Sequence, residues 1–293
     1  MIDRIYVTGG AGFIGSHLNA VLRAWMPQTT LVCMDRNASA AESQWDHHRM
    51  RDLRYQDTFD AEDLVPGSVV VHLAADPGVR GGGGAAVAFE HNFMATVNVA
   101  DWCLANGCRR LVFASSGAVH SVGTAYSSAY AVAKQASEGY LRVLRNAGLE
   151  VSILRFSNVY GYQRKPKAAV GRFCQALLTA AAPIINGDGY QSRDLIHVSD
   201  VCHAIVRAIT NEQPCDANIC TGVQTDILSL WEQLRAVAES SMLPIFSPNA
   251  FAGAPSNPMT PGGLPWEPLV SLDDGLRDTY QDFKNRGWDG RPA

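Results

Sequence analysis

The sequence predicts an α/β protein in which a doubly wound parallel sheet is joined to a smaller C-terminal lobe. Over the first two-thirds of the chain, short apolar runs alternate with longer amphipathic stretches, which is typical of alternating strands and helices. From about Gly161 this rhythm loosens and prolines become frequent. The length of 293 residues, 47% of them hydrophobic, suits one large domain or two interlocked lobes.

The elements of the first lobe are expected in a regular order. The expected strands are Ile5–Val7, Leu31–Met34, Val69–Leu73, Leu111–Ala114 and Val151–Leu154. The expected helices between them are Gly15–Trp25, Ala85–Leu104 and Tyr130–Asn146, each bounded by Gly, Pro or polar residues. Because the strands are continuously apolar, we expect a parallel sheet with helices on both faces.

The smaller lobe is expected from residues 161–293, after a first domain of residues 1–160. Its expected helices are Gly171–Ala181, Ser199–Thr210, Leu228–Glu239 and Leu272–Lys284. The second of these can return to the first domain, which would be rejoined by about residues 195–215. The segment Pro244–Pro268 contains seven prolines and is expected to be a loop. We expect this lobe to bind the substrate and to supply the second wall of a cleft.

Charge and cysteine content exclude several classes of protein. With 24 Lys and Arg against 28 Asp and Glu, the net charge of −4 gives no reason to expect nucleic acid or an anionic membrane as partner. No apolar run approaches the ~18 residues of a membrane span, and Ile2–Val7 leads into a glycine-rich turn instead of a secretory signal. The odd number of cysteines, seven, argues against a disulfide framework, so we expect a reducing, cytoplasmic location. The spacings of Cys103/Cys108 and Cys215/Cys220 are poor for zinc, so we expect free thiols and no metal.

A glycine-rich turn follows the first expected strand and opens the first expected helix. Within TGGAGFIG (8–15), Gly9, Gly12 and Gly15 lie three residues apart, and Gly10 forms an overlapping GxGxxG pattern with Gly12 and Gly15. Such a turn lets the backbone approach a pyrophosphate, and the N–H groups at the helix N-terminus face the phosphates. The sequence therefore predicts a Rossmann-type site for a dinucleotide.

Asp35 predicts which dinucleotide is bound. It ends the second expected strand, where a carboxylate can accept hydrogen bonds from a ribose diol. The same charge would repel the 2′-phosphate of NADP, so we expect NAD. Arg36 is the opposing signal, because an arginine at this place can accommodate that phosphate.

Tyr130 and Lys134 form the candidate proton-transfer pair. Their spacing of four residues places both side chains on one face of an expected helix. A phenol with an ordinary pKa of about 10 is a poor base at pH 7, and a nearby ammonium favours the ionised form. Ser116 closes the strand upstream and can hydrogen-bond a hydroxyl or keto oxygen. We expect these three residues to be catalytic.

With these motifs, the chain resembles the NAD-dependent sugar-nucleotide epimerase/dehydratase family of extended short-chain dehydrogenases/reductases, which includes the UDP-glucose 4-epimerases. The resemblance covers most of residues 1–210, with the motifs in family order. The matching stretches are TGGAGFIGSHL (8–18), Asp35, Asp52-Leu53, HLAA (72–75), Asn92 with Thr96, FASSGAV (113–119), YAVAK (130–134), LRFSNVYG (154–161) and GDGYQSRDLIHVSD (187–200).

The resemblance implies a role for each matching residue. At the adenine end of the cofactor, it implies that Asp52 and Leu53 flank the adenine and that Phe13 and Ile14 lie beside the pyrophosphate. Along the cofactor's path it implies Leu73, Ala74 and Ala75, with Asn92 supporting them. At the nicotinamide end, it implies that Tyr130 and Lys134 hold the ribose and that Ser157 lies near the carboxamide. On the substrate, it implies Ser116 at the reacting hydroxyl, and Asn158 and Arg193 at the nucleotide diphosphate. A guanidinium suits bidentate contact with phosphate.

Within this family the residues after Ser116 bear on the reaction. Members that eliminate water from a hexose carry Asp-Glu there, and decarboxylating members usually carry Glu. This chain has Gly117 and Ala118, which cannot act as acids. The resemblance then favours inversion at C4 of a nucleotide-activated hexose, such as a UDP-hexose, through a 4-keto intermediate. The alternatives are an NAD(P)-dependent reductase or dehydrogenase of a sugar nucleotide or another small hydroxy compound, and a non-catalytic dinucleotide-binding protein.

The resemblance also implies a homodimer and points to departures from the family. Ala85–Leu104 and Tyr130–Asn146 would supply the dimer interface. Tyr130 follows Ser116 by only 14 positions, so a loop that covers the substrate is expected to be trimmed. The run Gly81–Gly84 replaces a segment that is usually richer in side chains near the sugar pocket.

Overall fold

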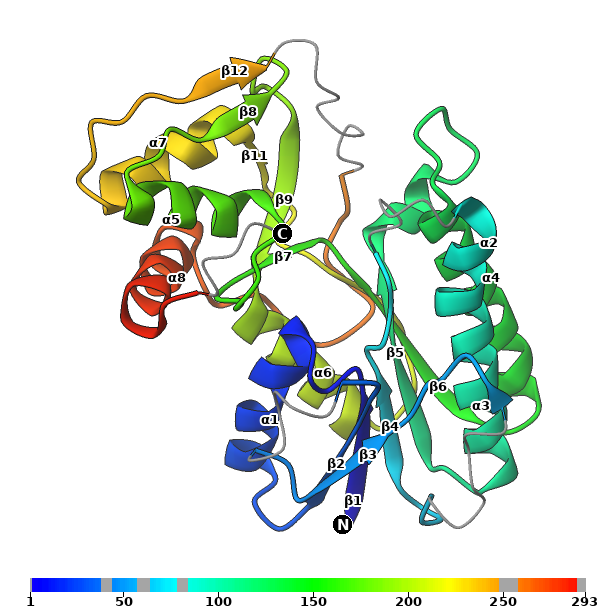
Figure 1. Ribbon diagram of the computed structural model, residues 1–293. Coiled ribbons are helices and arrows are strands. Elements are labelled where there is room, and N and C mark those ends of the chain that lie inside the picture. The colour runs from blue at the N-terminus through cyan, green and yellow to red at the C-terminus, as the bar shows by residue number, and fades with distance from the viewer. Residues whose placement is uncertain (1, 38–43, 57–63, 78–83, 248–257, 289–293) are drawn as a thin grey trace. The chain divides into compact units, whose positions relative to one another are not determined.

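A computed structural model describes residues 2–37, 44–56, 64–77, 84–247 and 258–288 (Figure 1). Residues 81–83 of the glycine run Gly81–Gly84 lie outside this description. The chain divides into two compact units. The first comprises Met1–Phe156, Val201–Ile219 and Gly262–Trp266, and the second comprises Ser157–Asp200, Cys220–Pro261 and Glu267–Ala293. Each unit is described by itself below.

The first unit is built on a parallel sheet of seven strands, which confirms the expected α/β class. The strands are β1 (Arg4–Thr8), β2 (Thr30–Asp35), β3 (His47–Met50), β4 (Val69–His72), β5 (Arg110–Ser116), β6 (Glu150–Phe156) and β10 (Asp216–Ile219), in the sheet order β10-β6-β5-β4-β1-β2-β3. All five expected strands are present. The strand order reverses between β1 and β4, and α/β proteins of this kind bind ligands beyond the carboxyl ends of the strands at such a switch point.

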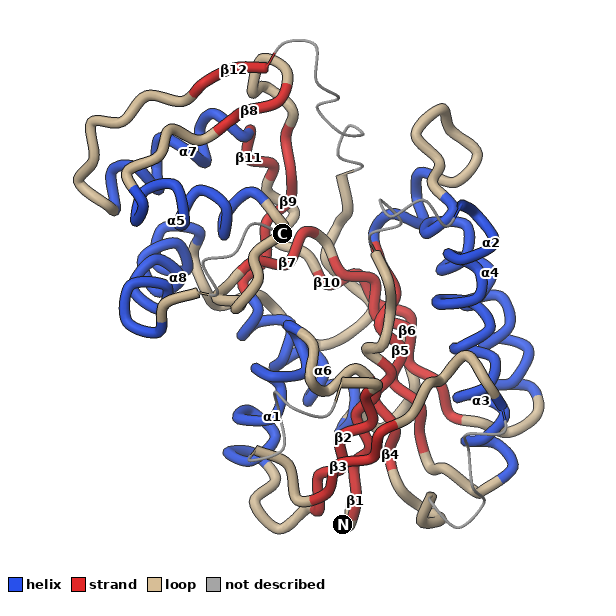
Figure 2. The backbone as a smooth tube through the Cα atoms, viewed as in Figure 1, coloured by secondary structure: helices blue, strands red, loops and turns tan. Residues whose placement is uncertain are grey.

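Helices cover both faces of this sheet, as Figures 1 and 2 show. The helices α1 (Phe13–Trp25) and α6 (Val198–Thr210) lie on one face, and α3 (Ala95–Ala105) and α4 (Ala129–Asn146) lie on the other. Their sheet-facing side chains are apolar and fully buried, for example Leu18 and Leu22 on α1 and Leu141 on α4. This burial of apolar area on both faces is what stabilises a parallel sheet.

The expected helix Ala85–Leu104 consists of three joined pieces. A short helix, α2 (Gly84–Ala88), leads into a π-helix (Phe89–Met94), which continues as α3. The wider π turn contains the buried Asn92, whose amide donates to the carbonyls of Ala88 at 2.9 Å and Asp76 at 3.2 Å. Because π turns are rare and often mark functional sites, this irregularity draws attention to Asn92.

The second unit combines two small sheets with three helices. Its elements are β7 (Asn158–Tyr160), α5 (Ala169–Thr179), β8 (Ile184–Asn186), β9 (Ser192–His197), β11 (Gln224–Asp226), α7 (Ile227–Val237), β12 (Ile245–Ser247) and α8 (Leu272–Arg286). Strand β9 lies between β7 and β11, and β8 pairs with β12. The segment Pro244–Pro268 was expected to be a loop, but it contains strand β12. The three residues of β12 lie between prolines and are extended because they pair with β8.

The core of the second unit is formed by the helices. Trp231 on α7 is fully buried and meets the ring of Phe173 on α5 edge to face, with 5.3 Å between ring centroids. Gly275 on α8 lies so close to Tyr160 that a Cβ atom would come within 2.1 Å of the tyrosine hydroxyl. Only glycine therefore allows α8 this approach to β7.

Two further structural findings concern the described residues. None of their helices is both long enough and apolar enough to cross a membrane. Among the same residues, no cluster of three or more His, Cys, Asp or Glu side chains is arranged to hold a metal ion.

Candidate active site

The glycine turn between β1 and α1 is too crowded for side chains. Gly9 has a φ of +69°, and a Cβ atom there would lie 2.7 Å from the backbone nitrogen of Ala74. At Gly15 a Cβ atom would lie 2.6 Å from the carbonyl oxygen of Gly9. Helix α1 begins at Phe13, so the first N–H groups of the helix have no partner within it. The residues therefore form the bare backbone cradle that a dinucleotide pyrophosphate requires.

Asp35 lies at the end of β2, beside this turn. Its carboxylate accepts hydrogen bonds from the backbone N–H groups of Ala11, at 3.1 Å, and Asn37, at 2.9 Å. These two bonds fix the carboxylate next to the glycine turn. Arg36 is exposed, and its charge helps to lower the pKa of Asp52. The arrangement fits the ribose contact predicted for Asp35.

Cofactor preference is expected to depend on Asp35. Replacing it in Asp35→Ala should weaken NAD binding about tenfold or more, because hydrogen bonds to a charged group contribute about 1.5–3 kcal/mol. The same change should weaken NADP binding much less, since a repulsive charge is removed as well. Titration of each dinucleotide into the protein measures this, with Arg36→Ala as the neighbouring control. Unmutated protein that binds NADP as tightly as NAD would contradict the assignment and favour Arg36.

The segment after β4 forms a wall next to the glycine turn. Thr8 holds this segment through two hydrogen bonds. Its backbone carbonyl accepts the N–H of Leu73 at 3.1 Å, and its side-chain hydroxyl accepts the N–H of Ala74 at 3.3 Å. Ala75 is exposed, and Asn92 fixes the next residue by accepting the N–H of Asp76 at 3.0 Å. The structure thus brings together the residues predicted to line and support the cofactor's path.

The two residues predicted to flank the adenine have other partners. Asp52 forms an ion pair with Arg54, with 2.5 Å between Oδ2 and Nη2. Leu53 is 7% exposed and packs in the hydrophobic core of the first unit. Its side chain has little surface left for a ligand, so contact with the adenine stays a prediction for this pair.

Ser116, Tyr130 and Lys134 meet at the carboxyl end of β5. Ser128 caps α4 by accepting the N–H of Ala131 at 3.1 Å, which starts the helix just before Tyr130. The Ser116 side chain lies near enough to the Tyr130 hydroxyl to lower its pKa. The Lys134 ammonium donates to the carbonyl of Ala114 at 2.7 Å and lies 6.0 Å from the centroid of the Tyr130 ring. The structure therefore assembles all three residues predicted to be catalytic.

Burial shifts the pKa values of both members of the proton-transfer pair. Burial raises the pKa of Tyr130 to about 12, and the Ser116 hydrogen bond opposes this rise. Burial lowers the pKa of Lys134 to about 7, and the charge of Glu138 opposes this fall. At neutral pH the phenol is therefore protonated, and the lysine is near the midpoint of its titration. A positive charge close to Tyr130 would favour its ionised form.

Three predicted site residues belong to the second unit, and a residue that the sequence analysis missed fixes two of them. Buried Asp194 on β9 accepts the Ser157 hydroxyl at 3.0 Å, and its backbone carbonyl accepts the side-chain amide of Asn158 at 3.2 Å. The same carboxylate accepts the N–H groups of Thr221 and Gly222 at 3.0 and 2.8 Å. The signal for Asp194 was its place next to Arg193 in a matched motif.

Arg193 lies on the same strand as Asp194. Its guanidinium donates to the carbonyl of Ser192 at 2.6 Å, and burial lowers its pKa from the ordinary value. The group is partly enclosed, and an arginine stays charged in this condition. Contact of Arg193 and Asn158 with a diphosphate stays a prediction.

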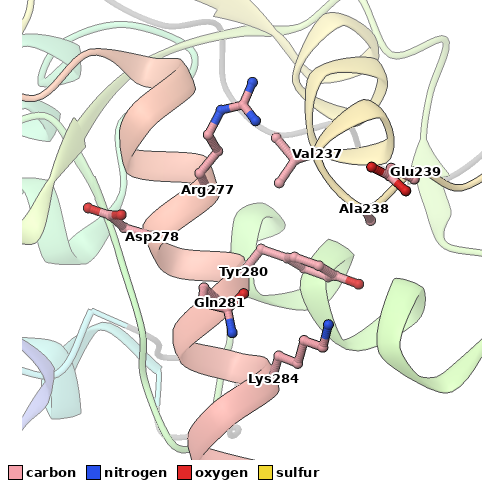
Figure 3. Close-up of a pocket in the computed structure, with 8 residues that line it drawn as sticks. All are labelled: Val237, Ala238, Glu239, Arg277, Asp278, Tyr280, Gln281 and Lys284. Carbon is pink, nitrogen blue, oxygen red and sulfur yellow. The ribbon is translucent and has the colours of Figure 1, made fainter.

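A separate cavity of about 500 Å³ lies between the end of α7 and one face of α8 (Figure 3). It is lined by Val237, Ala238, Glu239, Arg277, Asp278, Tyr280, Gln281 and Lys284. None of the predicted site residues is among them, so this cavity is not the candidate active site.

Comparison with known proteins shows the family of this chain. The sequence pattern of the NAD dependent epimerase/dehydratase family matches residues 5–220. UDP-glucose 4-epimerase of Mycolicibacterium smegmatis is 30% identical, over 97% of this chain and 99% of that protein. Another relative, 28% identical over 97% of this chain and 98% of its own length, is the UDP-N-acetyl-alpha-D-glucosaminuronate decarboxylase of Bacillus cytotoxicus.

Solved structures are similar along nearly the whole chain. UDP-glucose 4-epimerase of Thermotoga maritima, solved with UDP-glucose, superposes with a TM-score of 0.83 at 25% identity, over 97% of this chain and 99% of that one. UDP-glucose 4-epimerase of Thermus thermophilus, in complex with NAD, gives a TM-score of 0.79 at 25% identity, over 96% of this chain and 99% of that one. The expected fold and the expected cofactor, NAD, are confirmed. The chain belongs to the NAD-dependent epimerase/dehydratase family.

Proposed function

We propose that this protein is an epimerase that inverts C4 of a nucleotide-activated hexose, of the UDP-glucose/UDP-galactose type. The observation that carries the proposal is the assembly of Ser116, Tyr130 and Lys134 at the end of β5, followed by residues without acidic side chains. Bound at the glycine turn, NAD would supply the hydride acceptor and donor that inversion at C4 requires.

The chain's own residues handle the proton and the charge. In its ionised form, Tyr130 takes the proton of the C4 hydroxyl as the 4-keto sugar forms and returns it after the sugar has turned over. Ser116 donates a hydrogen bond to the same oxygen. Lys134, in its ammonium form, favours ionisation of the Tyr130 phenol. In the second unit, Ser157 is proposed to lie at the carboxamide of the cofactor, and Asn158 and Arg193 at the substrate diphosphate.

The reaction types of some relatives are less compatible with this site. A dehydratase or a decarboxylase needs a further acid or base near the sugar. Gly117 and Ala118, which follow Ser116 directly, have no group that transfers a proton. An NAD(P)-dependent reductase or dehydrogenase of a similar substrate needs only Ser116, Tyr130 and Lys134, so it remains the second candidate. A binding protein without turnover would not need Tyr130.

We also propose a cytoplasmic homodimer. All seven cysteines are free, as expected in a reducing compartment. On the helices that the family resemblance assigns to the dimer interface, Leu104 and Val143 are 37% and 62% exposed. Large apolar side chains exposed on neighbouring helices are typical of a subunit interface.

The two enzymatic candidates differ in what happens to the cofactor. An epimerase should convert a nucleotide sugar with no net change in the absorbance of reduced cofactor, and the purified protein should retain NAD. The test is a panel of UDP-, dTDP- and GDP-hexoses, with product sugars separated after incubation. Stoichiometric consumption of added cofactor with each turnover would instead support the reductase or dehydrogenase.

A further inference from the structure

The helix face that carries Tyr130 and Lys134 continues for one more turn to Glu138. Residues four apart on a helix lie above one another on the same face. Two of the three side chains are hydrogen-bonded to neighbouring residues at the end of β5. Lys134 donates to the Ala114 carbonyl at 2.7 Å, and Glu138 accepts the Ser115 hydroxyl at 2.6 Å. Helix α4 is thus joined to the end of β5 by two hydrogen bonds, one helical turn apart.

The Glu138 carboxylate is itself firmly held. Glu138 is only 3% exposed. Arg155 on β6 donates to both of its oxygens, at 2.8 and 2.6 Å, and Arg142 on α4 donates to one of them at 2.9 Å. Burial would raise the pKa of Glu138, but the hydrogen bonds from Arg155 and Ser115 hold it below the ordinary value. Glu138 therefore stays ionised, one helical turn beyond a fully buried lysine.

We propose that Glu138 is a positioning residue for the reaction: its carboxylate favours the ammonium form of Lys134 and ties the catalytic turns of α4 to the end of β5. The proposal rests on the proposed function for the roles of Lys134 and Tyr130. It assigns to Glu138 no contact with substrate or cofactor.

The other groups around Lys134 cannot replace this charge. Tyr130, on the same helix, is a neutral phenol at pH 7, because its pKa is about 12. His72 on β4 is fully buried, and burial and the charge of Lys134 lower its pKa to about 3, so it is neutral too. Arg155 on β6 acts through Glu138 and is cationic. Glu138 is therefore the group that opposes the burial penalty on the Lys134 ammonium.

The test is a direct titration of Lys134, which does not depend on turnover. The chain has only four lysines, at positions 134, 165, 167 and 284, so lysine labelled with carbon-13 at Cε gives a simple NMR spectrum. Lys134→Met assigns the signal. In unmutated protein the Lys134 midpoint should lie near 7. In Glu138→Gln it should fall by about one pH unit or more, since a nearby opposite charge shifts a pKa by roughly 1–3 units.

Two matched variants separate charge from packing. Glu138→Asp keeps the carboxylate and should keep the midpoint near that of unmutated protein. Asp216→Asn removes a carboxylate from the same cluster, where Arg142 and Arg145 contact it, and should leave Lys134 unchanged. An unchanged midpoint in Glu138→Gln, or an equal shift in Asp216→Asn, would overturn the proposal. A Lys134 midpoint below about 6 in unmutated protein would also overturn it, and this measurement does not depend on the folding of any variant.

Turnover supplies the second readout. With an active nucleotide sugar, Glu138→Gln should lower kcat about tenfold near pH 8 with KM changed less than about threefold. The loss should shrink toward pH 6, where Lys134 regains its proton, and Glu138→Asp should restore the position of the pH profile. A kcat loss that is equal at all pH values would contradict the role of the charge. Protein that shows the NMR shifts and converts no sugar would contradict the proposed function, and would support Glu138 as the group that keeps Lys134 charged.

Discussion

Tyr130→Phe should reduce turnover by about 10²–10⁴-fold, the usual contribution of general acid–base catalysis. The change removes the phenolic hydroxyl and keeps the ring. The ring supplies most of the packing, so folding and NAD binding should largely survive. Ser116→Ala should reduce turnover less than Tyr130→Phe does, because it removes a hydrogen-bond donor while the base remains. The measurements are kcat with an active nucleotide sugar and an NAD titration of each variant.

Tyr126 provides the matched control for this experiment. It lies shortly before α4, is 49% exposed and has Tyr130, not a lysine, four residues later. Tyr126→Phe should therefore leave turnover near that of unmutated protein. Near-normal turnover in Tyr130→Phe together with an inactive Tyr126→Phe would show that the catalytic base had been assigned to the wrong tyrosine.

Lys134→Met should abolish most activity and also change how stability depends on pH. Burial lowers the pKa of Lys134 from 10.5 to about 7 in the folded protein. Between these two values the unfolded chain binds more protons than the folded one, so this lysine makes the free energy of unfolding increase with pH. Below pH 7 both states are protonated, and the full cost of burying the charge is present. From pH 7 to 9, unmutated protein should therefore gain about 2 kcal/mol relative to Lys134→Met.

Denaturant unfolding at several pH values measures this difference. All other titrating groups are common to both proteins, so their contributions largely cancel. The same replacement at Lys284, on α8, is the matched control and should not reproduce this difference, because that side chain is already exposed in the folded protein. Parallel stability curves for unmutated protein and Lys134→Met would show that burial does not perturb Lys134.

Patterns local in sequence predicted much of the first unit. Buried parallel strands are continuous apolar runs, so β1, β2, β4, β5 and β6 could be recognised from composition alone. Strand β3 could not, because His47–Met50 is polar and mostly exposed, and becomes a strand only by pairing with β2 at the sheet edge. The π-helix was also missed, since one widened turn does not alter the apolar pattern of Ala85–Leu104.

The candidate site likewise contains residues that local patterns predict and residues that depend on contacts far along the chain. Gly9, Asp35, Tyr130 and Lys134 could be found because each chemical role requires a fixed spacing within one strand–turn–helix unit. Asp194 and Glu138 could not, because their importance lies in partners far along the chain. Asp194 is buried because β9 is the middle strand of its sheet. Glu138 receives its hydrogen bonds from β5 and β6, whose register fixes Ser115 opposite Arg155.

Substrate specificity is the least local property of all. The residues predicted to meet the diphosphate, Asn158 and Arg193, lie on β7 and β9 of the second unit. The short segment between Ser116 and Tyr130 and the run Gly81–Gly84 contribute few distinctive side chains. Neither backbone spacing nor helix periodicity encodes which sugar fits beside them.

Isotope retention at C4 tests the central claim most directly. A UDP-hexose carrying deuterium at C4 should be converted into its C4 epimer with the deuterium still at C4 and none released to solvent, because the hydrogen removed as hydride is the hydrogen returned. Mass spectrometry and NMR of the separated products provide the measurement. Loss of water with solvent hydrogen incorporated into the sugar, release of carbon dioxide, or transfer of the deuterium to added cofactor would contradict the proposed epimerase.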